Sequence, residues 1–322
     1  RIVYKAKDGE EYIFNLIDTP GHVDFGAEME RTLQVLDYGI LVISGADGVQ
    51  AHTETLWKLL RRYEIPTFLF INQMDQPGTD KEKTLAELQK KLDVNCIDYN
   101  GQDKDCLYDT AAMCSETLME EYLNTGKISD EAMNEAIGHR QIFPCLFGSA
   151  LKMEGVKELL AFMDAHMQHR EYPEEFGARV FKIVRDEQDN RLTYMKITGG
   201  SLKVKAMLTD YHEGMEPSEC WQEKADQIRL YSGGTYDMVN EVTAGAVCAV
   251  TGLSKTFCGQ GLGIETEPEQ TVLEPVLTYR VILSQDCNVH DMYLKLCKLE
   301  EEEPQLHIVW DENLSEIHAQ VM

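Results

Sequence analysis

Three residues that could bind and hydrolyse a phosphate lie within five positions of one another, at the end of an expected strand. Asp18 follows the strand expected over residues 12–17, and Gly21 and His22 come soon after it. The carboxylate can order a water on Mg²⁺, and a glycine amide can approach a phosphate because no side chain intervenes. His22 could position an attacking water. Asp-x-x-Gly alone is common in turns, but the longer pattern at a strand end predicts a site for a metal-bound terminal phosphate.

Two later loops carry polar residues that suit recognition of a base. One loop contains Asn72, Gln73 and Asp75, and the other contains Ser149, Ala150 and Leu151. A carboxylate can accept hydrogen bonds from both N1 and the exocyclic amine of guanine, a pair that adenine does not offer. Taken alone, Asn-x-x-Asp is also the pattern of an ordinary polar turn. Together with the first motif, however, these loops predict a ligand bound at the carboxyl ends of successive strands.

The first half of the chain alternates strand-like and helix-like patterns. An Asp-Gly pair within residues 7–10 predicts a hairpin. The continuous apolar runs 39–44 and 67–71 are typical of buried parallel strands. Thr79 and Glu82 are expected to form a capping box at the start of a helix. This alternation predicts an open, doubly wound α/β sheet.

The pattern changes after a segment of Pro, Glu and Gly at residues 171–177, which is expected to be a linker. Short strand patterns with glycine turns over 178–264 predict a small β-barrel. Residues 276–322 have the order strand, helix, strand, strand, which is typical of the first part of a split βαβ, ferredoxin-like domain. The acidic run 300–303 is expected to be a solvated helix end. The expected domains are 1–172, 173–270 and 271–322.

The composition excludes several classes of protein. Thirty Lys and Arg against 56 Asp and Glu give a net charge of −26, which should repel a bare phosphate backbone and argues against sequence-specific DNA binding. No apolar run approaches the roughly 20 residues of a membrane span. Nine cysteines without a C-x-x-C pattern indicate reduced thiols in a cytoplasmic protein. The alternative to free thiols is a metal cluster formed by Cys96, Cys106, Cys114 and His139.

Four blocks of the sequence resemble the motifs of the translational GTPases, the elongation factor G superfamily. Within that superfamily the likeness is greatest to the ribosomal-protection tetracycline-resistance proteins and their elongation factor G-like relatives. The blocks are Asp18–Phe25, Gly48–Glu54, Asn72–Asp75 and Gly148–Leu151. Further likeness in the barrel, at Gly199–Lys203 and Val250–Leu253, extends the resemblance over nearly the whole chain.

The resemblance implies a role for each candidate residue. Asp18 would hold a Mg²⁺ water, Gly21 would sense the γ-phosphate and His22 would orient the catalytic water. Asn72 and Asp75 would bind guanine, and the other loop would close over the base. The implied activity is GTP hydrolysis coupled to the ribosome, with GTP or GDP and Mg²⁺ as ligands.

Two departures from the family pattern affect these expectations. Gln73 stands where the family usually has a lysine, which removes a charge beside the base. The pattern G-x-x-x-x-G-K-[ST] does not occur in the sequence. The family places this phosphate loop, the switch-one threonine and a central strand before the point where the chain begins. We therefore expect a chain truncated at both ends that neither binds GTP tightly nor hydrolyses it.

Three hypotheses remain from the sequence. In the first, the chain is part of a ribosome-dependent GTPase. In the second, it is a ribosome- or partner-binding module that hydrolyses nothing. A nicotinamide-dependent enzyme is the weakest, because no glycine fingerprint follows the first strand. Whether the intact protein protects against tetracycline or translocates tRNA stays open.

Overall fold

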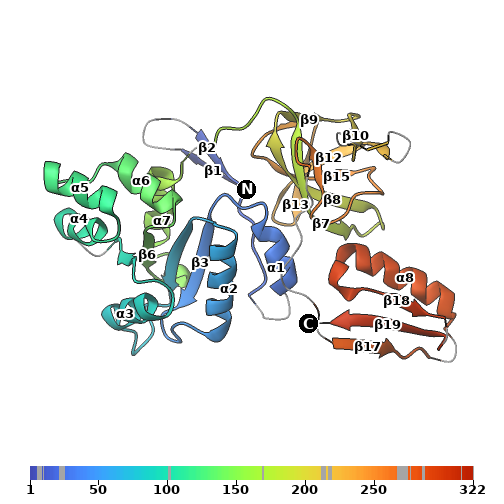
Figure 1. The fold of residues 1–322 in the computed structure, drawn as a ribbon, viewed down its shortest axis with the longest axis horizontal. Coiled ribbons are helices and arrows are strands. Elements are labelled where there is room, and N and C mark those ends of the chain that lie inside the picture. Colours follow the sequence, from blue (N-terminus) through green and yellow to red (C-terminus); the bar gives the residue numbers. More distant parts are fainter. Residues whose placement is uncertain are drawn as a thin grey trace. The chain divides into compact units, whose positions relative to one another are not determined.

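The computed structural model shows two compact units along the chain (Figure 1). One unit contains Arg1–Val35 and Glu171–Met322, and the other contains Leu36–Arg170. The first 35 residues therefore group with the carboxyl-terminal part of the chain, whereas the sequence placed them with the rest of 1–172. The residues described are 1–5, 9, 11–21, 26–100, 103–168, 170–211, 215–216, 220–266, 275, 277–284, 287–312 and 314–321.

The unit Leu36–Arg170 is built on a parallel four-stranded sheet of order β3-β4-β6-β5. Its strands are β3 (Gly39–Ser44), β4 (Thr67–Asn72), β5 (Cys96–Asp98) and β6 (Phe143–Phe147). Its helices are α2 (Ala51–Arg62), α3 (Lys81–Lys91), α4 (Lys104–Ala112), α5 (Glu116–Thr125), α6 (Asp130–Gly138) and α7 (Val156–His166). The strands β4, β5 and β6 are almost wholly buried, as their continuous apolar sequences predict.

Helices cover both faces of this sheet. Trp57 of α2 packs edge-on against Phe143 of β6, with ring centroids 4.7 Å apart. Phe162 of α7 packs against Phe68 of β4 at 5.1 Å. Because side chains alternate along strands paired in register, Phe143 and Phe68 point to opposite faces. The doubly wound arrangement predicted from the sequence is therefore observed in this unit.

The start of α3 differs from the capping box expected at Thr79. The N-cap is Asp80, whose carboxylate accepts a hydrogen bond from the Lys83 amide at 3.2 Å. The Thr79 hydroxyl instead donates to the carbonyls of Met74 and Gln76, both at 2.9 Å. Thr79 therefore closes the loop that follows β4, and Asp80 begins the helix.

The other unit begins with the predicted hairpin. Strands β1 (Ile2–Lys5) and β2 (Glu11–Phe14) pair antiparallel, with Lys5 opposite Glu11, and form a sheet of their own. Gly9 in the turn has φ +93°, a left-handed value that glycine adopts without strain. Helix α1 (Gly26–Leu33) follows.

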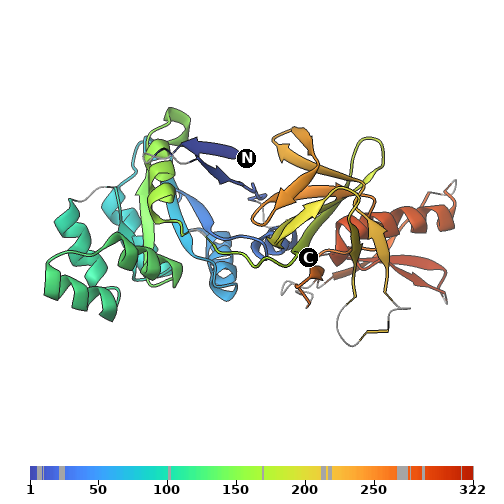
Figure 2. The same ribbon diagram turned by 90° about the horizontal axis from the view of Figure 1, so that it is seen from above.

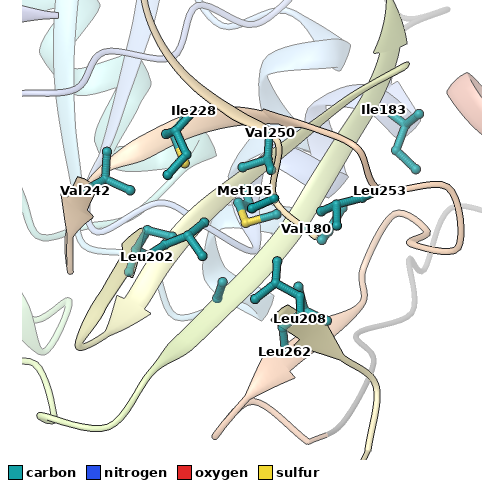
Figure 3. Close-up of a cluster of buried hydrophobic side chains, with 14 residues drawn as sticks. Val180, Ile183, Met195, Leu202, Leu208, Ile228, Val242, Val250, Leu253 and Leu262 are labelled. Carbon is teal, nitrogen blue, oxygen red and sulfur yellow. The ribbon is translucent and has the colours of Figure 1, made fainter. Parts of the chain in front are cut away.

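The middle of the chain forms antiparallel sheets around one core (Figure 3). A six-stranded sheet has the order β13-β12-β15-β8-β7-β16, and the pairs β9-β14 and β10-β11 accompany it. The inward side chains are mostly aliphatic, including Met195 and Ile197, which are fully buried. The strands are β7 (Gly177–Arg185), β8 (Arg191–Gly199), β9 (Ser201–Lys203), β10 (Met207–Thr209), β11 (Gln222–Lys224), β12 (Gln227–Ser232), β13 (Thr235–Val239), β14 (Glu241–Thr243), β15 (Val247–Thr251) and β16 (Gly261–Gly263).

The last elements form a small sheet of order β17-β19-β18 with helix α8 against it (Figure 1, Figure 2). Tyr293 of the helix contacts Trp310 of β18, with ring centroids 6.4 Å apart. Strand β17, which precedes α8, and strand β18, which follows α8, lie on either side of β19, as in a split βαβ unit. The elements are β17 (Leu277–Val281), α8 (Val289–Glu302), η3 (Pro304–Leu306), β18 (Val309–Asp311) and β19 (Glu316–Val321).

The acidic run at the end of α8 is not simply solvated, as the sequence had suggested. The Glu301 carboxylate lies 2.9 Å from Arg191 Nε and 3.3 Å from Arg185 Nη2. Glu303 pairs with Arg31 of α1 at 3.0 Å. These ion pairs join segments of the same unit that are distant in the sequence. Among the described residues, no helix combines the length and the apolar character needed to cross a bilayer.

Candidate base-binding site

The carboxyl ends of β3, β4 and β6 meet at one edge of the parallel sheet. Ser44 is opposite Asn72, and Ile71 is opposite Phe147. Hydrogen bonding continues into the loops, because the Gly45 amide donates to the Asn72 carbonyl at 2.8 Å. The predicted base-binding loops are therefore neighbours, as their positions after successive strands required.

Asn72 joins the two loops through one side-chain oxygen. Its Oδ1 accepts hydrogen bonds from the Gln73 amide and from the Ala150 amide, both at 2.8 Å. Residues 72 and 150 are 78 positions apart in the chain. An amide oxygen has two lone pairs and both are used here, so the Asn72 side chain fixes the separation of the loops.

A tight turn follows β6 and requires a glycine at its start. A Cβ on Gly148 would lie 2.3 Å from the Glu154 carbonyl oxygen and 3.0 Å from the ring of Phe70. The amide and carbonyl of Ser149 both pair with Glu154 at 3.0 Å. Between these residues lies the short helix η2 (Ala150–Lys152). The turn buries Ser149 and leaves Leu151 92% exposed at its tip.

Asp75 faces this turn from the loop after β4. Lys152 Nζ lies 3.2 Å from its Oδ2. Hydrogen bonds from the Ser149 side chain, and then from Lys152, hold the pKa of the Asp75 carboxyl below its usual range. The group is therefore ionised at neutral pH and can accept hydrogen bonds from a base.

Gln73 has an unusual conformation and a definite partner. Its φ is +63°, in the left-handed region that non-glycine residues rarely adopt. Its side-chain Oε1 accepts a hydrogen bond from the Ser44 hydroxyl at 2.8 Å, and that hydroxyl accepts one from the Asp47 amide at 3.2 Å. Gln73 thus links the loop after β4 to the loop after β3.

The residues expected at the phosphate belong to the other unit. Asp18 and Gly21 are exposed in an irregular segment after β2, and a Cβ on Gly21 would meet nothing within 4 Å. His22 lies outside the described residues. Within the described part of the chain, no group of three or more His, Cys, Asp or Glu could hold a metal ion, and this includes the described cysteines of the alternative cluster.

Sequence reasoning missed two residues of the base site, Ser44 and Lys152. Ser44 is the last residue of an apolar strand, and a polar residue at that place could have marked it. Lys152 directly follows Leu151, and a lysine beside a turn that faces an aspartate is a signal that could have been followed.

Comparison with known proteins identifies the family to which the chain belongs. The family model of the elongation factor Tu GTP binding domain matches residues 2–169, so the chain belongs to that family of GTP-binding domains.

Proteins that match a longer stretch of this chain include elongation factors G. Elongation factor G of Ureaplasma urealyticum serovar 10 is 28% identical, covering 96% of this chain and 56% of that protein. The same factor of Mycoplasma genitalium is 28% identical, covering 90% of this chain and 52% of that protein. The chain thus spans about half the length of these relatives.

A solved structure shares the fold. It is a crystal structure of a protein from Thermus thermophilus with a TM-score of 0.75 and 21% identity, covering 94% of this chain and 53% of that chain. The GTPase domain with mostly antiparallel sheets after it agrees with the multidomain α/β and β fold predicted from the sequence.

Proposed function

We propose that the chain is part of a ribosome-coupled translational GTPase and that the loops after β4 and β6 bind its guanine base. The observation that carries this proposal is the Asn72 side chain, which fixes the two loops together at the strand ends. The ionised Asp75 lies beside that junction. A site of this kind provides a carboxylate at a fixed distance from a turn of backbone amides.

In this proposal Asp75 accepts hydrogen bonds from guanine N1 and from the exocyclic amine. The Ser149 and Ala150 amides donate within the protein, to Glu154 and Asn72. The Leu151 amide is then the group of this turn that we assign to guanine O6. Adenine presents neither the N1 donor nor the O6 acceptor, so the site discriminates against it.

Base recognition can be tested on this chain with guanosine monophosphate (GMP), which needs little contribution from a phosphate loop. We expect GMP to shift the NMR signals of Asn72, Asp75 and Leu151, and adenosine monophosphate (AMP) to leave them in place. Equal shifts with both nucleotides would contradict a guanine site.

Hydrolysis is assigned to the segment after β2. Asp18 carries one exposed carboxylate, which fits Mg²⁺ because this ion keeps several waters and needs few protein ligands. The ion would neutralise charge on the phosphates, while Gly21 would offer its amide and His22 would orient water. For His22→Ala in the complete protein we expect nearly unchanged GTP affinity and ribosome-stimulated turnover at least about a hundredfold slower. Lost affinity with normal turnover at saturation would reverse the assignment.

The sequence contains no phosphate-loop motif, and we infer that the chain on its own binds GTP weakly and hydrolyses none. Titration with a fluorescent GTP analogue tests this, and sub-micromolar affinity would refute it. The alternative function is a ribosome- or partner-binding module without hydrolysis. In that case the complete protein would bind ribosomes but would show no ribosome-stimulated GTP hydrolysis.

The ribosome and a guanine nucleotide are the partners we propose, with action in the cytoplasm. The resemblance of the four sequence blocks, from Asp18–Phe25 to Gly148–Leu151, to the ribosomal-protection proteins supports the narrower proposal of tetracycline resistance. Expression of the complete protein in a tetracycline-sensitive host tests it. Unchanged sensitivity, together with support of translocation in vitro, would favour an ordinary elongation factor.

A further inference from the structure

The base site contains an ion pair that the proposed function does not use. Lys152 Nζ lies 3.2 Å from Asp75 Oδ2. The Asp75 side chain is 20% exposed and the Lys152 side chain is 53% exposed. The pair therefore lies at the rim of the site, where the lysine of η2 reaches the carboxylate.

The same turn supplies a second hydrogen bond to Asp75, from the Ser149 side chain. A carboxylate has about four lone-pair sites on its two oxygens. Ser149, Lys152 and the Asp75 backbone amide donate to this carboxylate. Lys152 lies on Oδ2, so lone-pair capacity remains for the base while Lys152 is bound.

The ammonium beside Asp75 belongs to Lys152 in the turn after β6. Gln73 in the loop after β4 is uncharged and supplies none. The Gln73 side chain is also bonded to Ser44. A short aspartate side chain that is held on one face by two donors keeps one orientation. Without the lysine, the carboxylate has more rotamers to lose when the base binds.

We propose that Lys152 is a positioning residue for base recognition, which holds the Asp75 carboxylate toward the guanine edge without itself touching the base. The inference rests on the proposed guanine site. Lys152 thereby couples the conformation of η2 to the group that selects the base.

The test compares binding of GMP and inosine monophosphate (IMP) to the full chain by saturation-transfer NMR. These nucleotides differ only in the exocyclic amine, so the ratio of their affinities reports the alignment of Asp75. Lys152→Ala should weaken GMP binding about two- to fivefold, in keeping with a partly exposed ion pair, and should reduce the GMP preference over IMP. Lys152→Arg should restore both. Lys157→Ala, which removes an exposed lysine of α7, is the matched control.

The acid side of the pH profile gives an independent readout. The pKa of Asp75 is lowered in the folded chain, so binding should persist on acidification until the pH falls through that lowered value. In Lys152→Ala the pKa of Asp75 should rise toward its usual range, and GMP binding should be lost at a higher pH. The carboxyl ¹³C signal of Asp75 reports this titration directly, and an unchanged heteronuclear spectrum elsewhere shows that the variant is folded.

The outcomes separate the two proposals. If the wild-type chain binds GMP and AMP equally, the proposed guanine site itself fails. If the wild type prefers GMP but Lys152→Ala leaves the GMP to IMP ratio and the Asp75 titration unchanged, the guanine site stands and the role of Lys152 is overturned. Tighter GMP binding in Lys152→Ala would also overturn it, because the lysine would then compete with the base. Should Lys152→Ala be unfolded, Lys152→Gln serves the same comparison.

Discussion

Gln73 occupies a position of the proposed base site where the family resemblance predicts a lysine. Its left-handed φ of +63° and its bond to Ser44 hold it beside the loop after β3. In the complete protein, Gln73→Lys should raise GTP affinity by about ten- to a hundredfold, because the new ammonium would hydrogen-bond the phosphate loop, and a hydrogen bond to a charged group is worth about 1.5–3 kcal/mol. Competition with a fluorescent GTP analogue measures the change.

The guanine preference should not change in Gln73→Lys, because this residue is not assigned to the base edge. Gln73→Met keeps the unbranched stem without the charge and should leave the affinity near that of the wild type. An equal gain in both variants would show that charge is not the cause.

The position of two candidate residues at the edge of the sheet could be predicted from the sequence, because Asn72 ends a strongly apolar strand and Asp75 follows it. Their roles in binding a base stay predictions. Their partners could not be predicted, because the Asn72 bond to Ala150 depends on a turn 78 residues further along the chain. The Asp75 contact with Lys152 depends on the same folding of that turn.

At the scale of elements, a buried histidine connects α7, α6 and the end of β5. His166 is 3% exposed, and its Nδ1 lies 2.6 Å from Asn134 Oδ1. Its Nε2 is hydrogen-bonded to the Tyr99 hydroxyl. Burial lowers the pKa of His166 to about 4, so the folded unit holds this ring neutral.

This histidine predicts a loss of stability at mildly acidic pH. Its pKa is about 6.5 in an unfolded chain, so between pH 6.5 and pH 4 the unfolded state binds the additional proton. The stabilisation is complete above about pH 6.5 and falls as the pH is lowered, by about 2 kcal/mol between pH 7 and pH 5. Hydrogen exchange of the β6 amides reports the free energy of unfolding of this unit.

The comparison is with His166→Gln, in which this part of the pH dependence should disappear. The exposed His139, with a side chain 70% accessible, provides the control variant His139→Gln with a wild-type slope. Equal slopes in all three proteins would mean that His166 does not titrate as its burial requires.

In the other unit, Arg191 joins β8 to a loop and to α8. Its guanidinium donates to the Leu253 carbonyl at 2.7 Å and to the Thr256 hydroxyl at 2.8 Å. It also bonds the buried Thr193 at 3.1 Å and Glu301 at 2.9 Å. Arg191→Met would leave buried oxygens without a donor, and we expect a loss of about 3 kcal/mol in the free energy of unfolding.

The loss from Glu301→Gln should be smaller, below about 1 kcal/mol, because the Glu301 side chain is 40% exposed. Lys203→Met, which breaks an exposed pair with Glu241 at 3.7 Å, should change almost nothing. Urea unfolding followed by the fluorescence of Trp221, which packs against this core, ranks the three variants. A loss from Arg191→Met no larger than that from Glu301→Gln would contradict the assignment.

The elements show where sequence patterns reach their limit. Apolar patterns predicted β3 and β4 of the parallel sheet and the β-rich region after residue 177, although β2 ends at Phe14 and not at residue 17. The strand β5 and the helices α4, α5 and α6 were not predicted. The capping box at Thr79 was wrong because a better acceptor, Asp80, stood next to it. The acidic end of α8 was misjudged because its partners Arg31 and Arg191 lie more than a hundred residues away.

At the scale of the whole molecule, the chain forms two units, and the proposed base site lies within Leu36–Arg170. The residues assigned to the phosphate lie in the unit that contains Arg1–Val35. The family model of the GTP-binding domain spans residues of both units, from 2 to 169.

The central claim, that Asp75 selects guanine, is tested most directly by exchanging the base together with the residue. Asp75→Asn should weaken GTP and improve xanthosine triphosphate in the complete protein, because xanthine has a carbonyl where guanine has its amine and asparagine can donate to it. The preference should move by about ten- to a hundredfold. Competition binding of both nucleotides to the folded variant measures the ratio: a shift toward xanthosine triphosphate is the predicted result, and an unchanged ratio would show that Asp75 does not read the base.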